Sequence, residues 1–524
     1  MRPDNIILVG FMGVGKDTVA QEIARLTDYV MISTDHLIQL ETGISIRNIF
    51  KKKGEQYFRD LEQKVVSRLS NLKNMVVATG GGIFLRKKNR NLLSGMGYLI
   101  HLDARPEVLR KRIARLWTRP LLKNYEDINR IYKQRQKIYR GGIKIDTSER
   151  TPQEVAREII DHLRLKETRP GIRMTRIVLR TDSKRCLFYV GYGLFSKSGM
   201  FRIEKPCRAL VISNPLVAGF YADGVLRFLK QAGIEPELSL VPDGESYKNI
   251  EEAVRLYNLL LQRRFSRGDL IVGLGGGVVC DLAGFVASTY KRGMGLIQIP
   301  TTLLAQVDAA IGGKNGLNHR GKNMLGTFYQ PDAVFCDLQF LKTLSDYDMK
   351  NGLAEVIKYG VICDPELFTQ LKKERASVLK RDMKVLKKIV TRSIQIKAEI
   401  VKVDEREETG KRAILNFGHT VAHIIETQTH YQKLSHGEAV AIGMAEESKW
   451  AYQQGYLKQD ELDKILKILS EYKLPTSLPS SIGPEAIRGA VLQDKKVRRE
   501  RLILPIPQKV GRVRLKEVRC EKFL

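Results

Sequence analysis

Cysteine is scarce in this sequence, and long uninterrupted apolar runs are missing. Only 6 of the 524 residues are cysteine, and no two of them have the CxxC spacing of a zinc ribbon or a redox motif. The scattered thiols argue against a disulfide framework and fit a reducing cytoplasm. The most apolar window, Leu270 to Ala287, is broken by glycines and carries Asp281. It therefore predicts a buried strand, a turn and a helix rather than a membrane span. The chain starts directly with the strand-like run Ile6 to Val9, so no signal peptide is expected.

Acidic residues are also few relative to basic ones. The sequence has 58 Asp and Glu against 89 Lys and Arg, a formal net charge of +31. Such an excess attracts either nucleic acid or small anionic substrates. The basic residues are spread along the whole chain, and short runs such as Lys51 to Lys53 lack interleaved aromatic residues. We interpret them as solvated faces, which favours anionic small molecules and leaves a nucleic-acid-tethered enzyme as the alternative. The length predicts two to four domains.

Histidine is rare, but it is concentrated in one stretch. Of eight histidines, four lie between positions 419 and 436. His419 and His423 are four residues apart, so both project from one face of a helix, and His436 follows after a short break. Imidazole is a common metal ligand, and ligands from two segments fix a divalent ion better than neighbours on one. The stretch predicts a metal site; the alternative is an amphipathic helix with half-buried histidines.

The amino-terminal stretch predicts a phosphate-binding loop. The run Ile6 to Val9 is followed by Gly10, Gly13 and Gly15 and then by Lys16. Glycines in this pattern let backbone N–H groups turn around phosphate oxygens, and the lysine adds a positive charge. The next position should be Ser or Thr, whose hydroxyl binds Mg²⁺, but it is Asp17.

Further stretches of the first third resemble shikimate kinase. They are Ser33 to Asp35, Gly54 to Glu62, Val76 to Gly82, Arg119 to Leu122 and Arg135 to Tyr139. The resemblance covers essentially the first 160 residues and implies a P-loop kinase fold, a parallel sheet with helices on both faces. It implies that shikimate binds to Asp35, Arg59, Gly81 and Arg135. It implies that ATP with Mg²⁺ binds to Gly13, Val14, Gly15, Lys16, Asp17, Thr18 and Arg119. Lys111 to Thr118 would lie in or near the lid, with Arg112 beside the adenine. Lys16, Asp35 and Arg135 would take part in catalysis.

Two positions depart from the shikimate kinase pattern. The family has Ser or Thr where this chain has Asp17, and it has the first Asp of an Asp-x-Asp pair where this chain has Ser33. Both positions serve Mg²⁺ in the family. Either the metal site is rearranged, with Asp17 as a ligand, or this half is weakened. The second option leaves open a non-catalytic, nucleotide-binding regulatory P-loop domain.

The remaining chain predicts a second α/β module. The kinase-like domain is expected over residues 1–165, followed by a polar linker over 166–174 that contains Pro170-Gly171. From Arg208 onward, short apolar runs alternate with helical stretches, which predicts a parallel sheet that binds a nucleotide at its carboxyl edge. The turn Gly275 to Asp281 fits close approach to a phosphate, although it lacks the GxGxxG spacing.

Residues 175–510 resemble 3-dehydroquinate synthase. The motifs that carry this resemblance run in sequence order: Pro242 to Lys248, Tyr290 to Gly293, Pro300 to Asp308, Gly312 to Lys314, Gly321 to Asn323, Gly352 to Lys358, Lys397, Arg412, the histidine stretch and Asp494 to Lys496. NAD-linked metal dehydrogenases share the glycine turn and a histidine pair, but not the basic series Lys314, Lys322, Lys358 and Lys397. The resemblance implies an NAD-binding α/β part over residues 175–335 and a mainly helical, metal- and substrate-binding part over 336–524.

The resemblance also assigns roles to individual residues. Glu355, His419 and His436 would hold Zn²⁺ or Co²⁺, which leaves His423 facing the substrate. NAD would bind to Asp243, Gly244, Glu245, Lys248, Gly277, Val278, Val279, Asp281, Thr301, Thr302, Lys314, Lys322, Phe340, Leu341, Lys342 and Thr343. The substrate would be lined by Asp308, Asn323, Lys358, Lys397, Arg412, Asn416, His423 and one of Lys495 or Lys496. Arg292 would reach it from a partner subunit, since the family usually forms dimers through the synthase module. His430 is interpreted as structural.

The two resemblances together predict a bifunctional cytoplasmic enzyme of the shikimate pathway. One reaction would be ATP-dependent 3-phosphorylation of shikimate. The other would convert 3-deoxy-D-arabino-heptulosonate 7-phosphate to 3-dehydroquinate with loss of phosphate, with NAD and a metal ion. These reactions are not consecutive, so direct handover between the sites is not expected.

Overall fold

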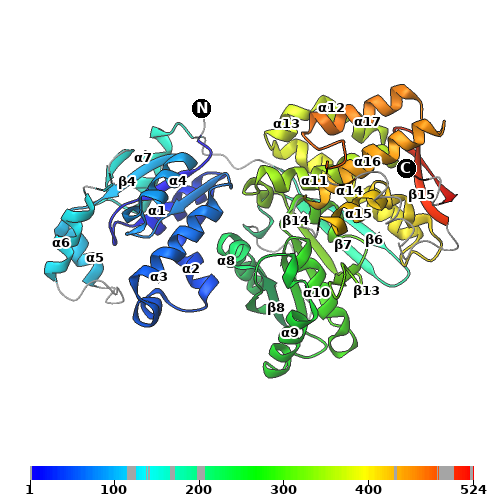
Figure 1. The fold of residues 1–524 in the computed structure, drawn as a ribbon. Coiled ribbons are helices and arrows are strands. Elements are labelled where there is room, and N and C mark those ends of the chain that lie inside the picture. Colours follow the sequence, from blue (N-terminus) through cyan, green and yellow to red (C-terminus); the bar gives the residue numbers. More distant parts are fainter. Residues whose placement is uncertain are drawn as a thin grey trace.

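The computed structural model describes residues 3–114, 125–136, 138, 139, 142–165, 172–196, 207–429, 434–480, 482, 501–519 and 523. Two α/β parts lie side by side, an amino-terminal part and a larger carboxy-terminal part, with α8 (Pro215–Gln231) of the larger part facing the smaller one (Figure 1). The predicted linker over 166–174 lies outside the described residues as far as position 171.

The amino-terminal part is a parallel sheet of five strands. Its order is β2-β3-β1-β4-β5, and every pairing is parallel. The strands are β1 (Ile6–Val9), β2 (Val30–Ser33), β3 (Met75–Ala78), β4 (Tyr98–Asp103) and β5 (Ile143–Asp146). All residues of β1 and β3 are buried, as expected for strands covered on both faces.

Helices cover both faces of this first sheet. The core on one face includes α1 (Lys16–Leu26), α5 (Pro106–Ala114), α6 (Tyr125–Gln136) and α7 (Pro152–His162). The core on the other face includes α2 (Thr34–Thr42), α3 (Ile46–Leu69) and α4 (Lys87–Met96). The phosphate loop follows β1, Ser33 ends β2 and Gly80 follows β3. Because parallel strands end at the same edge, these segments lie together.

The carboxy-terminal part begins with a sheet of seven strands. Its order is β6-β7-β14-β11-β10-β8-β9, and only the edge pair β6–β7 is antiparallel. The strands are β6 (Thr175–Arg180), β7 (Arg185–Gly191), β8 (Cys207–Ser213), β9 (Ile234–Leu240), β10 (Leu270–Gly275), β11 (Gly295–Pro300) and β14 (Ala333–Asp337). Helix α8 packs on one face, and α9 (Ile250–Gln262) and α10 (Gly277–Thr289) pack on the other. The hairpin β12 (Lys314–Leu317) and β13 (Leu325–Phe328) lies beside α10.

The rest of the carboxy-terminal part is mainly helical. Its helices are α11 (Asp346–Ile362), α12 (Pro365–Lys373), α13 (Arg375–Leu379), α14 (Met383–Val403), α15 (His419–Gln428), α16 (His436–Gln453) and α17 (Gln459–Glu471). The chain ends in an antiparallel hairpin of β15 (Arg501–Lys509) and β16 (Arg512–Arg519), which the sequence did not predict. Its turn docks on α11, where the N–H of Gly511 donates to the carbonyl of Val361 at 2.9 Å.

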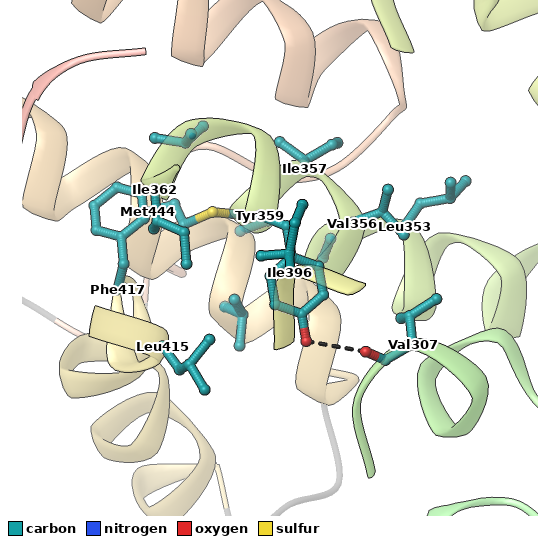
Figure 2. Close-up of a cluster of buried hydrophobic side chains, with 14 of the residues drawn as sticks. Val307, Leu353, Val356, Ile357, Tyr359, Ile362, Ile396, Leu415, Phe417 and Met444 are labelled. Carbon is teal, nitrogen blue, oxygen red and sulfur yellow. Dashed lines mark hydrogen bonds between the residues drawn. The ribbon is translucent and has the colours of Figure 1, made fainter. Parts of the chain in front are cut away.

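Helix α11 lies at the centre of the helical core. All of its residues from Gly352 to Ile362 are buried. Figure 2 shows Tyr359 among these apolar side chains, with its hydroxyl donating to the carbonyl oxygen of Val307 at 3.0 Å. This bond fixes α11 against the segment that follows β11.

The observed architecture confirms the predicted α/β fold class, with a mainly helical region after the second sheet. The apolar window from Leu270 forms strand β10, a turn and helix α10, as expected. Among the described residues, no helix combines the length and apolar character needed to cross a membrane.

Candidate active sites

Three residues from three helices form a candidate metal centre. Glu355 lies within α11, His419 begins α15 and His436 begins α16, and one ligand atom from each lies within 4.8 Å of the others. Oε1 of the fully buried Glu355 lies 3.5 Å from Nε2 of His419 and 3.6 Å from Nε2 of His436. Ligand atoms about 2.1 Å from a tetrahedral zinc ion stand roughly 3.4 Å apart. One carboxylate and two imidazoles at these separations fit a divalent cation.

Small residues bring the two histidine helices together. Gly418, just before His419, has a φ of +80°, and a methyl group at Gly443 of α16 would lie 1.8 Å from its carbonyl oxygen. The N–H of Gly418 also donates to Glu447 Oε2 at 2.7 Å. The start of α15 is therefore held directly against α16.

A capping box fixes the start of α16. The hydroxyl of Ser435 accepts a hydrogen bond from the N–H of Glu438, whose carboxylate accepts one from the N–H of Ser435. A methyl group at Gly437 would lie 2.3 Å from the carbonyl oxygen of Asn351 on α11. This close approach places His436, the first residue of α16, beside the helix that carries Glu355.

The two histidines have opposite electrostatic surroundings. Burial, together with the positive charge of Lys358 and the neighbouring histidines, lowers the pKa of His419 well below its usual range. Burial also opposes protonation of His436, but the carboxylates of Glu355 and Glu426 outweigh it and raise the pKa to about 9. A cation bound at this centre would displace the His436 proton.

Glu426 orients His436 and was not among the predicted site residues. Its Oε1 accepts from Nδ1 of His436 at 2.9 Å and from Nζ of Lys322 at 2.8 Å. Burial opposes ionisation of Glu426, yet these partners lower its pKa to about 2. A carboxylate that holds one imidazole nitrogen directs the other toward a metal. In the sequence, Glu426 could have been identified by its position seven residues after His419, which places both residues on the same face of the helix.

His423 lies beside the centre rather than in it. Its ring is 5.7 Å from that of His419, edge to face, and it is not one of the three clustered ligands. The helical spacing alone predicted His419 and His423 as the two metal ligands, whereas the structure groups His419 with His436.

Several predicted basic residues gather around Asp308. Nζ of Lys397 lies 2.6 Å from Oδ1 of Asp308, and the hydroxyl oxygen of Tyr359 lies 2.8 Å from the same carboxylate oxygen. Burial would raise the pKa of Asp308, but Lys397 and Lys358 hold it far below its usual range. Burial lowers the pKa of Lys397 to about 8 despite the attraction of Asp308. Lys358 also pairs with Glu355.

Arg412 and Asn416 lie on the short helical turn η7 (Lys411–Asn416), which leads to His419. Arg412 is 1% exposed and donates to the carbonyls of Gly312 at 3.1 Å and Glu405 at 2.6 Å. Burial lowers the pKa of Arg412, although it remains a strong base. Asn416 is half-buried.

A cavity of about 640 Å³ is lined by both the glycine turn and His436. Its size is typical of a site for a cofactor or drug-sized ligand. Eleven of the residues expected to bind a dinucleotide line it: Asp243, Gly244, Glu245, Gly277, Val278, Val279, Thr301, Thr302, Lys322, Phe340 and Thr343. The N-terminus of α10 opens into it at Gly277, where no side chain caps the helix, as required for a phosphate site.

Other predicted residues lie away from this lining. Lys248 bonds to Asp281 at 2.8 Å and to Asn323 at 2.6 Å. Lys314 pairs with Glu407, and Lys342, next to Leu341, pairs with Asp28 of the amino-terminal part. Arg292 is exposed beyond the end of α10 opposite the glycine turn. Lys495, Lys496 and His430 lie outside the described residues.

Asn214 lines the cavity and was also missed from the sequence. It caps α8, accepting from the N–H of Val217 at 2.9 Å, and its Nδ2 donates to Oδ1 of Asp243 at 3.0 Å. Asn followed by Pro215 is a helix-start signature that could have located it. Leu72, from the amino-terminal part, lines the same cavity.

The predicted phosphate loop has the expected backbone. Gly13 and Gly15 have φ angles of +84° and +92°, which only glycine adopts readily. Nζ of Lys16 lies over the loop and donates to the carbonyls of Gly10 and Phe11, both at 2.9 Å. Asp17 is exposed in the first turn of α1, together with Thr18.

All four residues expected to bind shikimate line one small cavity: Asp35, Arg59, Gly81 and Arg135. Arg59 pairs with Glu62 at 2.7 Å, and Arg135 donates to the carbonyl of Gly81 at 3.0 Å. Burial raises the pKa of Glu62 to about 7, although the positive charge of Arg59 acts to lower it. Glu62 also lines the cavity, although the predicted binding residues did not include it.

The hydroxyl of Ser33 caps α2 by accepting from the N–H of His36. Arg112 donates to the carbonyl of Thr147 at 2.6 Å. Arg119 and residues 115–118 of the expected lid lie outside the described residues.

Three family models match successive parts of the chain. Shikimate kinase matches residues 12–164, the N-terminal domain of 3-dehydroquinate synthase matches 238–351, and its C-terminal domain matches 352–497. A 3-dehydroquinate synthase of Desulforamulus reducens is 44% identical over 328 residues, which are 62% of this chain and 91% of that protein. A 3-dehydroquinate synthase of Thermodesulfovibrio yellowstonii is 46% identical over 306 residues, 58% of this chain and 85% of that protein.

Solved structures resemble the carboxy-terminal part. The 2-epi-5-epi-valiolone synthase ValA from Streptomyces hygroscopicus subsp. jinggangensis, with NAD⁺ and Zn²⁺ bound, is 28% identical at a TM-score of 0.59. The match covers 64% of this chain and 94% of that one. A 2-deoxy-scyllo-inosose synthase, complexed with carbaglucose-6-phosphate, NAD⁺ and Co²⁺, shares the fold at 24% identity and a TM-score of 0.60, with 66% and 98% of the chains covered.

Proposed function

The chain belongs to the 3-dehydroquinate synthase family and carries a shikimate kinase domain in front of the synthase, and we propose that both halves are catalytically active. The synthase would convert 3-deoxy-D-arabino-heptulosonate 7-phosphate to 3-dehydroquinate and phosphate. The kinase would transfer the γ-phosphate of ATP to the 3-hydroxyl of shikimate. Hereafter the two parts are called the synthase part and the kinase part.

One observation carries the synthase proposal: a candidate metal ligand and the uncapped helix N-terminus line the same cavity. His436 belongs to the three-residue cluster, and Gly277 stands at the start of α10. A redox cofactor and a cation that act on the same substrate carbon must lie within one enclosed space. The neighbour ValA has NAD⁺ and Zn²⁺ bound, and Glu355, His419 and His436 supply a donor set that suits such a cation here.

The cofactor and cation would supply chemistry that side chains lack. NAD would accept and later return the hydride of the substrate carbon that carries a hydroxyl group, and the metal ion would polarise that hydroxyl. The substrate carries a carboxylate and a phosphate, so its binding requires cations. Lys358, Lys397 and Arg412 are buried near Asp308 and meet that requirement. The ion pair with Asp308 fixes the orientation of the Lys397 ammonium group.

The kinase proposal depends on the phosphate loop and the arginine-lined cavity. Lys16 would leave the loop carbonyls and neutralise phosphate charge, while Arg59 and Arg135 would hold the shikimate carboxylate. Asp35 lines the same cavity and would accept the proton of the reacting hydroxyl. Mg²⁺ would bind beside Asp17, the exposed carboxylate after the lysine.

A second function for the kinase part is nucleotide binding without phosphate transfer. It is favoured by two departures from the kinase pattern, Asp17 after the lysine and Ser33 at the end of β2, where the hydroxyl caps α2. In this form the kinase part would regulate the synthase.

We infer two further properties from the family and the free thiols. A homodimer formed through the synthase part would let the exposed Arg292 reach the partner's site. Five described cysteines are free, in keeping with a cytoplasmic enzyme.

Two assays on the full chain test these proposals. We expect shikimate-dependent ADP release with ATP and Mg²⁺, and dehydroquinate formation from the heptulosonate phosphate with NAD and Zn²⁺. ADP release that does not depend on shikimate would favour the regulatory alternative. Absence of dehydroquinate with both cofactors present would overturn the synthase proposal.

A further inference from the structure

The kinase part packs against the helix that begins at the synthase cofactor cavity. Leu216 and Phe220 of α8 pack into a core of the kinase part, and Leu40 of α2 packs into a core of the synthase part. At Gly219, between these contacts, an added methyl group would lie 3.0 Å from the side chain of Ile32. The two parts therefore share an apolar contact, and Figure 1 shows α8 facing the blue helices α2 and α3.

One arginine of the kinase part bonds directly to a residue that lines this cavity. Arg68, in the last turn of α3, donates through one guanidinium nitrogen to Glu41 at 2.7 Å and through another to Oδ2 of Asp243. The other oxygen of Asp243 accepts from Nδ2 of Asn214 at 3.0 Å. Asp243 and Asn214 both line the cavity, so a continuous polar chain runs from the kinase helices to its wall.

The kinase part also supplies part of the wall itself. Leu72, in the loop after α3, lines the cavity. Its position is fixed within the kinase part, because its N–H donates to Leu69 and its carbonyl accepts from Nδ2 of Asn5, both at 3.0 Å. The cavity of the synthase is thus incomplete without the kinase part.

We propose that Arg68 is a positioning residue for the dinucleotide site of the synthase, so that this site is fully formed only when the kinase part is docked. The inference rests on the proposed binding of NAD in this cavity. Asp243 follows strand β9, and a carboxylate at the end of the second strand of a nucleotide-binding fold accepts the ribose hydroxyls. Arg68 and Asn214 hold one carboxylate oxygen each, which restricts rotation of the group.

Arg68 also contributes its positive charge. Asp243 faces the same cavity as Gly277 and Val278, where the phosphates of a dinucleotide would bind. Without the guanidinium, Asp243 would present an unneutralised negative charge to an anionic ligand. Both side chains are partly exposed, so solvent weakens the ion pair, and we expect a moderate effect on affinity rather than its loss.

The test compares three variants of the full chain: Arg68→Ala, Arg68→Lys and Lys73→Ala. Lys73 also forms an ion pair across the two parts, with Asp346 at 3.0 Å, but neither residue lines the cavity. The Lys73→Ala variant therefore controls for weaker docking of the kinase part on the synthase part. NAD affinity is measured by titration calorimetry, and the KM for NAD and kcat are measured for the synthase reaction.

For Arg68→Ala we expect the Kd and KM for NAD to rise about tenfold, with kcat at saturating NAD within about twofold. The Kd and KM of Arg68→Lys should lie between those of Arg68→Ala and the unaltered chain. The ammonium group neutralises Asp243, but it lacks the planar guanidinium that bonds to Glu41 and Asp243 through two separate nitrogens. Lys73→Ala should stay within about twofold in every parameter. A circular dichroism spectrum and a thermal unfolding midpoint equal to those of the unaltered chain show that each variant remains folded.

Unchanged NAD affinity in Arg68→Ala would overturn the inference. An equal loss of NAD affinity in Lys73→Ala would also overturn it, because weaker docking of the two parts would then explain both results. If Arg68→Ala does not fold, Arg68→Lys decides: weaker NAD binding supports the inference, and wild-type affinity overturns it. Failure of the unaltered chain to bind NAD is a different result, since it removes the proposed cofactor itself.

Discussion

Glu426 holds Nδ1 of His436 at 2.9 Å, and Nε2 of the same ring faces Glu355 at 3.6 Å. This arrangement fixes the ring so that only one nitrogen is available to a cation. The carboxylate belongs to α15 and the imidazole to α16, so the bond also joins the two helices that carry the candidate histidine ligands.

Glu426→Gln should therefore weaken metal binding while the three ligands remain. The amide keeps the size of the side chain but loses the charge that supports the imidazole. We expect Zn²⁺ affinity to fall about 10- to 100-fold in a competition titration with a chelator. Glu446→Gln on α16 is the control, because Glu446 pairs with Lys449 rather than with a histidine. Equal affinity in Glu426→Gln and the unaltered chain would contradict the orienting role.

The metal-free chain should lose stability as pH rises from about 6.5 to about 9. The two carboxylates raise the folded-state pKa of His436 to about 9 against burial, so the stabilising contribution is complete below the unfolded value near 6.5. This contribution disappears as pH rises through the folded-state pKa, and the free energy of unfolding falls by roughly 3 kcal/mol at most. Urea unfolding of chelator-treated protein across this range measures the loss. His436→Ala should remove this pH dependence, and an unchanged slope in that variant would assign it to another group.

Asp17 and Ser33 should behave as an exchanged pair in the kinase part. The kinase family has a hydroxyl at the first position and a carboxylate at the second, and this chain has the reverse. Asp17→Ser should raise the Mg²⁺ requirement and slow phosphate transfer. Ser33→Asp keeps the cap of α2, since Asp caps helices as well as Ser does, but it places two carboxylates at the metal.

The double variant restores the family arrangement and should recover more activity than the two single effects predict. Kinase rates against Mg²⁺ concentration for all four proteins test this. Strict additivity would show that the two positions act separately.

Cutting the chain within residues 166–174 should give two soluble pieces. Each piece contains its own sheet and core, so each should retain its activity. The synthase piece should need about tenfold more NAD, because it lacks Leu72 and Arg68, and adding the kinase piece should lower that requirement. Insolubility of both pieces would contradict separable domains.

Sequence periodicity and glycine spacing predicted the alternation of strands and helices but not the β15–β16 hairpin, and they could not place long-range contacts. The window from Leu270 formed strand, turn and helix because glycines interrupt an otherwise apolar run. The grouping of His419 with His436, which begin two different helices, was not visible from helical spacing, which favoured His423; only the family resemblance assigned both to the metal.

Residues that act through a neighbour were the hardest to predict. Glu426 and Asn214 are common polar residues whose roles depend on partners in other elements. The bond between Arg68 and Asp243 joins positions 175 residues apart in two different parts, and neither position belongs to a pattern that includes the other. Only the folded arrangement reveals it.

The most direct test of the whole account is metal content and turnover in His419→Ala and His423→Ala. Chelation of the unaltered chain should abolish dehydroquinate formation, and Zn²⁺ should restore it. His419→Ala should lose bound zinc per chain, whereas His423→Ala should keep the zinc and lose rate. Equal zinc loss in both variants, or full turnover in the presence of chelator, would contradict the assignment of Glu355, His419 and His436 as the metal centre.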